Sequence, residues 1–244
     1  MINKVKSKIR QFLAYDDFYY LNRYLIELNN QNELKKVFRW GNDPIISDNS
    51  IYDFLYIEDV NERRIRDAET IGTVSCNVNN GVFLEIGTSR GHSTALIAKN
   101  APSGKIYTVN IDPEEAMSGK GGILITEALN REDIGSFYKE KGFKNIKQIF
   151  TNTATWKPDV GTVDVAFIDG CHDTEFVYRD TVKVIKHMKK GSIIMWHDFN
   201  LDLTKKIHWI NSVCLGIEKL YRDGIIKGRI YHIRDSWVGI YQIA

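Results

Sequence analysis

The 244-residue sequence lacks four features that would each assign it to a class of protein. No apolar run approaches the roughly 18 residues of a membrane-spanning helix, and the first residues lack the apolar core of a signal peptide. Its three cysteines lie far apart and form no Cys-x-x-Cys pair, which argues against a zinc site or a disulfide framework. A net charge of +2 is too near neutral to indicate nucleic-acid binding. We therefore expect a globular, cytoplasmic protein without a membrane span or a nucleic-acid partner.

The N-terminal part of the chain reads differently from the rest. Residues 5–39 carry Leu, Ile and Tyr at helical spacing, which predicts two helices. Apolar positions such as Phe12 and Leu25 exceed what so small a unit can bury by itself. We therefore predict a helical appendage over residues 1–58, which covers a cleft or forms a dimer contact, followed by the main domain over residues 59–244.

Strand-like and helix-like segments alternate through the main domain. Strands are predicted at 82–86, 106–111, 146–150, 163–168, 191–196, 228–233 and 236–242. Helices are predicted at 59–76, 92–100, 124–141, 174–190 and 204–223. This alternation indicates an α/β fold with a mostly parallel sheet covered on both faces. Only two residues join the last two strands, which permits an antiparallel hairpin but not a parallel crossover.

The stretch over residues 83–93 is the most informative about function. An apolar run enters a turn with Gly87, Ser89 and Gly91, and a helix-compatible run follows. Glycine lets a ligand approach the backbone closely, and a helix N-terminus offers free N–H groups. The next strand leads to Asp112, whose carboxylate can accept hydrogen bonds from both hydroxyls of a ribose. The pattern predicts a nucleoside-containing cofactor across two adjacent strand ends.

Two other interpretations of this turn are weaker. Gly-x-Ser-x-Gly is also the nucleophile elbow of the α/β-hydrolases, with Ser89 as nucleophile, Asp198 as acid and His208 or His232 as base. The residues upstream read as mostly helical and contain no oxyanion-hole loop, so a serine hydrolase is a remote alternative. The nicotinamide fingerprint Gly-x-Gly-x-x-Gly fails, because position 89 is Ser.

Polar residues also follow the fourth and fifth predicted strands. Asp169 and His172 come after the fourth, and His197 and Asp198 come after the fifth. The carboxyl ends of parallel strands meet at one edge of a sheet, so these side chains should converge on one cleft. Two carboxylates and an imidazole suit Mg²⁺ or Mn²⁺. His172, with an ordinary pKa near 6.5, suits a general base at neutral pH.

These motifs carry a resemblance to a known family. The run Glu85-Ile86-Gly87-Thr88-Ser89-Arg90-Gly91, with Asp112, resembles the first motif and the ribose-binding acid of the class I S-adenosylmethionine-dependent methyltransferases, over roughly residues 60–244. Residues 167–172, followed by His197 and Asp198, more narrowly resemble the metal-dependent O-methyltransferases of the macrocin and cephalosporin-biosynthesis type. The resemblance implies a Rossmann-like seven-stranded sheet of order 3-2-1-4-5-7-6 with the last strand antiparallel.

The resemblance also implies an activity and roles for residues. We expect methyl transfer from S-adenosyl-L-methionine to a hydroxyl of a sugar, glycan or glycosylated small molecule. A catechol-like phenolic acceptor and a non-catalytic cofactor-binding protein are the alternatives. The acceptor site should lie in residues 1–58, 113–123 and 199–212, and a homodimer is expected.

The expected site residues fall into three groups. His172 acts as base, with Asp169 counted as catalytic beside it. Asp169 and Asp198 bind a divalent metal, Mg²⁺ or Mn²⁺, with His197 where the family has an acid. The cofactor residues are Glu85, Gly87, Thr88, Ser89, Gly91, Ser93, Asp112, Thr153, Ala154 and Asp169.

Overall fold

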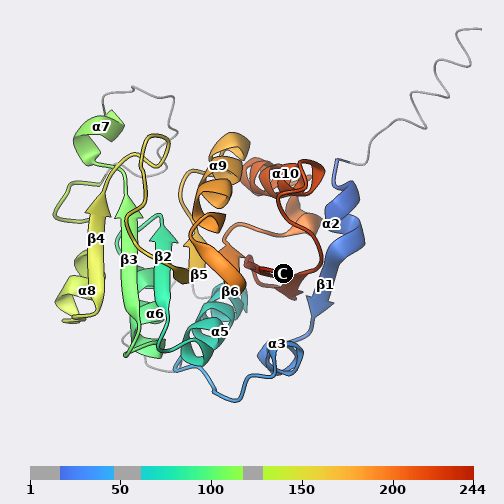
Figure 1. Cartoon of the computed structure of the whole chain (residues 1–244), viewed down its shortest axis with the longest axis horizontal. Coiled ribbons are helices and arrows are strands. Elements are labelled where there is room, and N and C mark those ends of the chain that lie inside the picture. Colours follow the sequence, from blue (N-terminus) through green and yellow to red (C-terminus); the bar gives the residue numbers. More distant parts are fainter. Residues whose placement is uncertain (1–16, 47–61, 118–128) are drawn as a thin grey trace, which may run out of the picture.

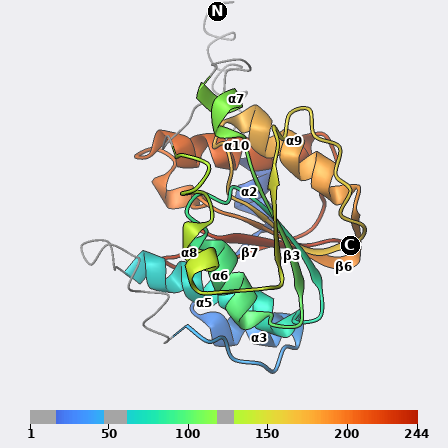
Figure 2. The same cartoon turned by 90° about the vertical axis from the view of Figure 1, so that its left-hand side faces the viewer.

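The computed structural model describes residues 17–46, 62–117 and 129–244. One sheet runs through the molecule in the order β1-β7-β8-β6-β5-β2-β3-β4. Helices cover both of its faces (Figure 1; Figure 2). The strands are β1 (Leu25–Leu28), β2 (Val82–Ile86), β3 (Lys105–Asn110), β4 (Ile146–Phe150), β5 (Val163–Ile168), β6 (Met188–Trp196), β7 (Ile230–Ile233) and β8 (Gly239–Gln242). The helices are α2 (Tyr19–Tyr24), α3 (Gln31–Phe38), α5 (Glu62–Asn77), α6 (His92–Asn100), α7 (Pro113–Met117), α8 (Ser136–Glu140), α9 (Thr174–Ile185), α10 (His208–Arg222) and the 3-10 helix η2 (Leu201–Leu203).

The prediction of a seven-stranded sheet is wrong, because β1 adds an eighth strand. It pairs in parallel with β7, so the order of the whole sheet differs from the predicted one. The difference is confined to that edge: the other seven strands, numbered among themselves, run 3-2-1-4-5-7-6. Strand β8 is antiparallel to both β6 and β7. Residues 25–28 were predicted as helix from their leucine spacing, and pairing with β7 outweighs that local pattern.

The segment that carries β1 is attached to the main domain through α10. The buried carboxylate of Glu218 accepts hydrogen bonds from the backbone N–H groups of Tyr20 and Leu21, at 3.1 and 3.0 Å. It thereby satisfies N–H groups at the start of α2 from another element. The rings of Tyr20 and Tyr24 stack on Tyr221, with centroids 5.8 and 5.4 Å apart. The predicted domain boundary near residue 58 lies outside the described residues and stays a prediction.

Two predicted elements end elsewhere. Helix α9 stops at Ile185 and β6 begins at Met188, so the helix predicted over 174–190 is wrong at its end. Lys189 and Lys190, the last residues of the predicted helix, belong instead to the exposed start of β6. Residues 113–117 form α7 rather than the loop predicted over 113–123, and the remainder of that segment is outside the described residues. Of the helix predicted over 124–141, α8 accounts for 136–140.

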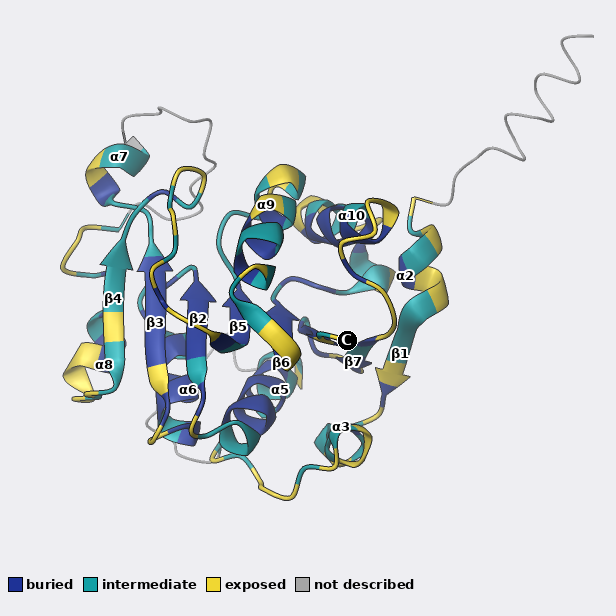
Figure 3. Ribbon diagram, in the orientation of Figure 1, coloured by how far each residue is buried: buried dark blue, intermediate teal, exposed yellow. Residues whose placement is uncertain are grey.

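The core consists of two apolar layers, one on each face of the sheet. Helices α2, α9 and α10 pack on one face, and α3, α5 and α6 pack on the other. Strands β2, β5 and the end of β6 are buried, whereas β1 and β4 at the edges are only partly covered (Figure 3). Among the described residues, no helix combines the length and the apolar character that crossing a lipid bilayer requires.

Candidate functional site

The glycine turn predicted from the sequence connects β2 to α6 in a strained backbone conformation. Gly87, Ser89 and Gly91 have φ values of +105°, +47° and +87°. A Cβ atom on Gly87 would lie 1.9 Å from the carbonyl oxygen of Asp169, so only glycine fits there. The N–H group of Ser89 donates to Oδ1 of Asn110, the last residue of β3, at 3.1 Å. The turn is therefore held against the ends of both β3 and β5.

A group of polar side chains supports the turn from within the core. Glu85 is 1% exposed and Thr88 is 3% exposed. Oε2 of Glu85 accepts hydrogen bonds from the hydroxyls of Thr108, at 2.5 Å, and Thr94. Burial raises the pKa of Glu85 to about 8, although these hydroxyls act in the opposite direction. Glu85 is therefore protonated at neutral pH, and the side chains of Glu85 and Thr88 lie beneath the predicted cofactor site rather than on its surface.

The acid predicted to bind ribose lies two residues beyond β3 and is already paired. Oδ2 of Asp112 accepts from Nη1 of Arg131 at 2.6 Å. The guanidinium of Arg131 lies 4.2 Å from the centroid of the Phe150 ring, at the end of β4. Asn110, the last residue of β3, contacts the glycine turn directly. The sequence analysis missed this residue. The only signal for it was a polar residue at the end of an apolar strand.

Three further predicted cofactor residues lie at the same edge of the sheet. Ser93 is in the first turn of α6 and is partly exposed. Thr153 and Ala154 follow β4, and the N–H group of Ala154 donates to Oδ1 of Asn152 at 2.9 Å. The amide of Asn152 in turn donates to Glu115 of α7 at 2.7 Å. The carboxyl ends of β2, β3 and β4 thus present the predicted cofactor residues side by side.

The second predicted cluster forms where β5 and β6 end. Nε2 of His172 lies 3.0 Å from Oδ2 of Asp198 and 4.0 Å from Oδ1 of Asp169. One ligand atom from each of the three lies within 4.8 Å of the other two. Two carboxylate oxygens and an imidazole nitrogen so close together suit a divalent ion such as Mn²⁺. This group contains His172. His197, which the sequence analysis expected as a metal ligand, is not part of it.

The two histidines shift the charges of this cluster. Burial by itself would lower the pKa of His172, but Asp198 and Asp169 outweigh it and raise that pKa. Burial would raise the pKa of Asp198, yet hydrogen bonds from His172 and His197 bring it far below its ordinary value. The cluster therefore contains ionised carboxylates next to imidazoles that bind protons readily.

His197 lies among three carboxylates. Its Nδ1 is 3.1 Å from Oδ1 of Asp169 and 3.5 Å from Oδ2 of Asp198, and its Nε2 is 3.3 Å from Oδ2 of Asp67. Burial disfavours the charged ring, but these carboxylates outweigh it and hold the pKa of His197 well above its usual range. An imidazolium that donates from both nitrogens has no lone pair for a metal ion.

Asp67 is the residue of this cluster that the sequence analysis missed. It comes from α5 and is 7% exposed. Its Oδ1 accepts from the backbone N–H of Trp237 at 2.6 Å, and its Oδ2 accepts from Arg63 at 3.1 Å as well as facing His197. Nothing in the charged sequence of α5 distinguishes Asp67 from its neighbours, because two of its partners, His197 and Trp237, follow β6 and precede β8.

The residues of the alternative hydrolase triad are not brought together among the described residues. Ser89 makes backbone contacts with Asn110 and Gly135. Nε2 of His232 lies 2.7 Å from the carbonyl oxygen of Ser236, and its Nδ1 is 3.4 Å from Glu27. The carboxylate of Asp198 pairs instead with His172 and His197.

Comparison with known proteins identifies the fold. Residues 84–199, from β2 to just beyond β6, match a protein family described as a methyltransferase domain. A sequence search among curated proteins gives no match. The O-methyltransferase NovP is 12% identical, with a TM-score of 0.54, over 76% of this chain and 84% of that one. The S-adenosylhomocysteine-bound methyltransferase PaMTH1 of Podospora anserina is 13% identical, with a TM-score of 0.52, over 87% and 94% of the two chains.

A third solved structure supports the same conclusion. The O-methyltransferase TomG of Streptomyces achromogenes, which is involved in tomaymycin synthesis and was solved with S-adenosylmethionine, is 12% identical. Its TM-score is 0.51, over 88% of this chain and 96% of that one. At such identities the likeness shows the fold alone. The protein has the Rossmann-like α/β fold of the class I methyltransferases.

Proposed function

We propose that the protein is an S-adenosylmethionine-dependent O-methyltransferase. One observation carries the proposal: Asp169, a member of the Asp169–His172–Asp198 cluster, also contacts the glycine turn. The backbone carbonyl of Asp169 packs against Gly87, while its side chain faces the cluster. A cofactor on the turn and an acceptor at the cluster would therefore be neighbours, as transfer between them requires.

The residues at the ends of β2, β3 and β4 fit the cofactor. The Gly87–Gly91 turn, whose glycines allow close approach to the backbone, and the N–H groups at the start of α6 would bind its methionine part, and Asp112 its ribose. The Asn152–Ala154 turn would lie at its adenine. Bound there, S-adenosylmethionine supplies a methyl group whose bond to sulfur breaks as the acceptor oxygen bonds to the carbon, and the electron pair stays on the sulfur.

His172 would take the proton that the acceptor hydroxyl loses. Oδ2 of Asp198 accepts a hydrogen bond from Nε2 of His172, so Nδ1 of His172 keeps the lone pair that a base needs. Its raised pKa makes this imidazole a stronger proton acceptor than an ordinary one. Asp198 would act as a positioning residue that orients the ring and stabilises the imidazolium.

Asp169 and Asp198 fit a divalent ion, Mg²⁺ or Mn²⁺. Their oxygens lie within a few ångströms of each other and of His172, and a cation would offset the repulsion between the two carboxylates. A bound ion would lower the pKa of an acceptor hydroxyl. We place His197 in a supporting role, because carboxylates occupy both of its nitrogens.

A sugar, glycan or glycosylated small molecule is the proposed acceptor. The support is the resemblance of residues 167–172, His197 and Asp198 to O-methyltransferases that act on sugar hydroxyls, together with a polar cavity at the start of α10. We also propose a homodimer, because Tyr19, Val37 and Ile45 in the N-terminal segment stay 49%, 41% and 48% exposed. Light scattering that shows a monomer at all concentrations would contradict the dimer.

Cofactor binding gives the first test. Calorimetry with S-adenosylhomocysteine should show binding that Asp112→Ala weakens by about 1–3 kcal/mol, as loss of charged hydrogen bonds would. Asp159→Ala, an exposed aspartate in the loop after β4, is the matched control and should leave the affinity unchanged. No binding to the wild-type protein would contradict the proposed function itself.

Methyl transfer gives the second test. A panel of sugar and phenol acceptors would be incubated with S-adenosylmethionine, and products would be detected by mass spectrometry. Chelator should abolish transfer, and added Mg²⁺ or Mn²⁺ should restore it. Full activity in excess chelator would remove the metal from the proposal and leave His172 as an unaided base.

A further inference from the structure

We infer that a cavity between the N-terminal segment and the start of α10 binds a negatively charged group of the acceptor, a carboxylate or a phosphate on a sugar. This inference rests on the proposed function, since it names the chemical class of the acceptor. The cavity has a volume of about 400 Å³, large enough for a monosaccharide. Its lining residues are Asp17, Phe18, Thr204, Lys205, Lys206, His208 and Asn211.

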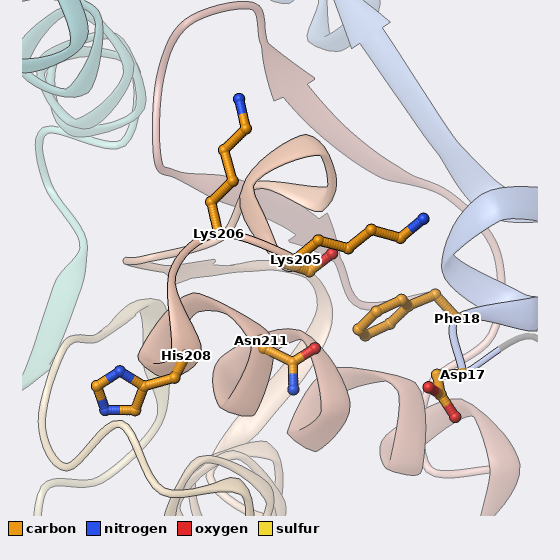
Figure 4. Close-up of a pocket in the computed structure, with 7 residues that line it drawn as sticks. Asp17, Phe18, Lys205, Lys206, His208 and Asn211 are labelled. Carbon is orange, nitrogen blue, oxygen red and sulfur yellow. The ribbon is translucent and has the colours of Figure 1, made fainter.

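The charge of the lining favours an anion. Two lysines stand against one carboxylate, that of Asp17. In the described part of the chain, no carboxylate forms an ion pair with Lys205 or Lys206. Phe18, Asp17 and Lys205 lie at one side of the cavity, and Lys206 and His208 lie at the other (Figure 4). Cationic groups at both sides can bind an anion that enters between them.

Helix α10 adds to this positive potential. It has 15 residues and begins at His208, and its N-cap residue, Ile207, makes no side-chain hydrogen bond to the first turn. The N–H groups at this end are therefore left for solvent or a ligand, and the helix dipole favours negative charge there. The cavity and its lysines carry the inference, and the uncapped helix acts in the same direction.

Two short connections link the elements that line this cavity to the proposed catalytic cluster. The hydroxyl of Thr174, two residues after His172, donates to the backbone carbonyl of Ser212 in α10 at 3.0 Å. Ser212 directly follows Asn211, which lines the cavity. From the other side, η2 leads from Asp198 to Thr204 in a few residues. An acceptor anchored in the cavity would thus extend toward His172.

The lining also offers what a sugar ring needs. Phe18 provides an aromatic face, and the amide of Asn211 can bond to hydroxyl groups. The hydroxyl of Thr204 donates to the carbonyl oxygen of Leu201 and can still accept from a sugar hydroxyl. A neutral sugar would use these groups and leave both lysines without a counterion. A sugar that carries a carboxylate or a phosphate would use all of them. The inference therefore commits to a charged sugar.

The test measures binding of three probes to the full chain by isothermal titration: D-glucuronate, glucose 6-phosphate and glucose. We expect the two anions to bind and glucose to bind at least tenfold more weakly. The double variant Lys205→Gln, Lys206→Gln should weaken anion binding by about three- to tenfold, as loss of two partly exposed ion pairs would. Lys144→Gln, an exposed lysine before β4, is the matched control. Asn211→Leu is a second variant that should weaken both anions.

Each result decides the inference. Tighter binding of glucuronate supports a carboxylate, and tighter binding of glucose 6-phosphate supports a phosphate. Equal binding of glucose, or anion binding that the double variant leaves unchanged, overturns the inference. S-adenosylhomocysteine binding separates it from the proposed function. Methyl transfer to neutral acceptors that does not depend on the lysines overturns only the inference, whereas anion binding without cofactor binding overturns only the proposed function.

Discussion

The two halves of the sheet's carboxyl edge are held together by different forces. Around β2 and β3, which we call the backbone-determined half, the glycine turn depends on backbone conformation, and the buried carboxyl group of Glu85 is neutral. Around β5 and β6, which we call the charged half, three carboxylates surround His197 and ionic contacts dominate. A turn set by backbone conformation suits a cofactor that is bound along its length. A dense group of charges suits proton transfer and cation binding.

Loss of the base should give the largest effect and should affect only the charged half. His172→Ala is expected to lower kcat by about 10²–10⁴-fold, the usual contribution of a general base. S-adenosylhomocysteine affinity should stay unchanged, because His172 lies outside the glycine turn. Steady-state kinetics and calorimetry would measure the two. His187→Ala, in the connection before β6, is the control, and unchanged kcat in His172→Ala would contradict the assigned role.

The neutral carboxyl of Glu85 should make stability depend on pH. Its pKa is about 8 in the folded protein, above its ordinary value of 4.5. Between these pH values the folded state keeps a proton that the unfolded state releases, so stability falls as pH rises, by about 1.4 kcal/mol per pH unit. Glu85→Gln should remove this slope. Urea unfolding from pH 5 to pH 8 would measure the difference between wild type and variant, with exposed Glu140→Gln as control.

If the free energy of unfolding changed with pH by the same amount in the wild type and in Glu85→Gln, this account would be contradicted. It would mean that Glu85 is ionised in the folded protein, and that the two halves of the edge differ less in charge than their contacts indicate.

Loss of the ionic contact between Asp67 of α5 and His197 should have an intermediate effect on stability. Asp67→Asn keeps an acceptor for the N–H group of Trp237 but removes the charge that faces His197 and Arg63. We expect a loss of about 1–3 kcal/mol in the free energy of unfolding. Chemical denaturation would measure it, with exposed Asp202→Asn as control. A change no larger than the control's would show that Asp67 serves only as a backbone acceptor.

The smallest effect should come from Arg131, in the backbone-determined half. Its ion pair with Asp112 is largely exposed, so it is worth at most about 1 kcal/mol. If the cofactor's ribose takes over Asp112, Arg131→Ala should increase affinity for S-adenosylhomocysteine by up to about fivefold. Calorimetry would measure it, with Lys157→Ala as control. Weaker binding would instead show that Arg131 itself contacts the cofactor.

What the sequence could predict follows from how local each feature is. The glycine turn is contiguous, and β2, β4 and β5 have the predicted bounds because apolar runs mark buried strands. The structure brings Asp169, His172 and Asp198 together because their positions follow from neighbouring strand ends. The roles assigned to these residues remain predictions.

Three features that the sequence analysis missed depend on distant partners. Strand β1 has leucines at helical spacing and becomes a strand only through pairing with β7. Asp67 gains its importance from His197 and Trp237, which lie far along the chain. The apolar run around Glu85 predicts a buried strand, but the proton that Glu85 keeps depends on how completely the rest of the fold removes water from its side chain. Tertiary contacts, rather than local propensity, decide each of these.

The pairing of β1 with β7 has a consequence for synthesis of the protein. Leu25 lies opposite Ile230, so the first of the described strands to leave the ribosome pairs with one of the last. Roughly two hundred residues separate them, which at cellular rates of translation takes about 10–40 seconds. During that time the segment that will form β1 has no strand to pair with. A chain interrupted before residue 230 keeps that strand unpaired, open to chaperones and proteases that recognise incomplete chains.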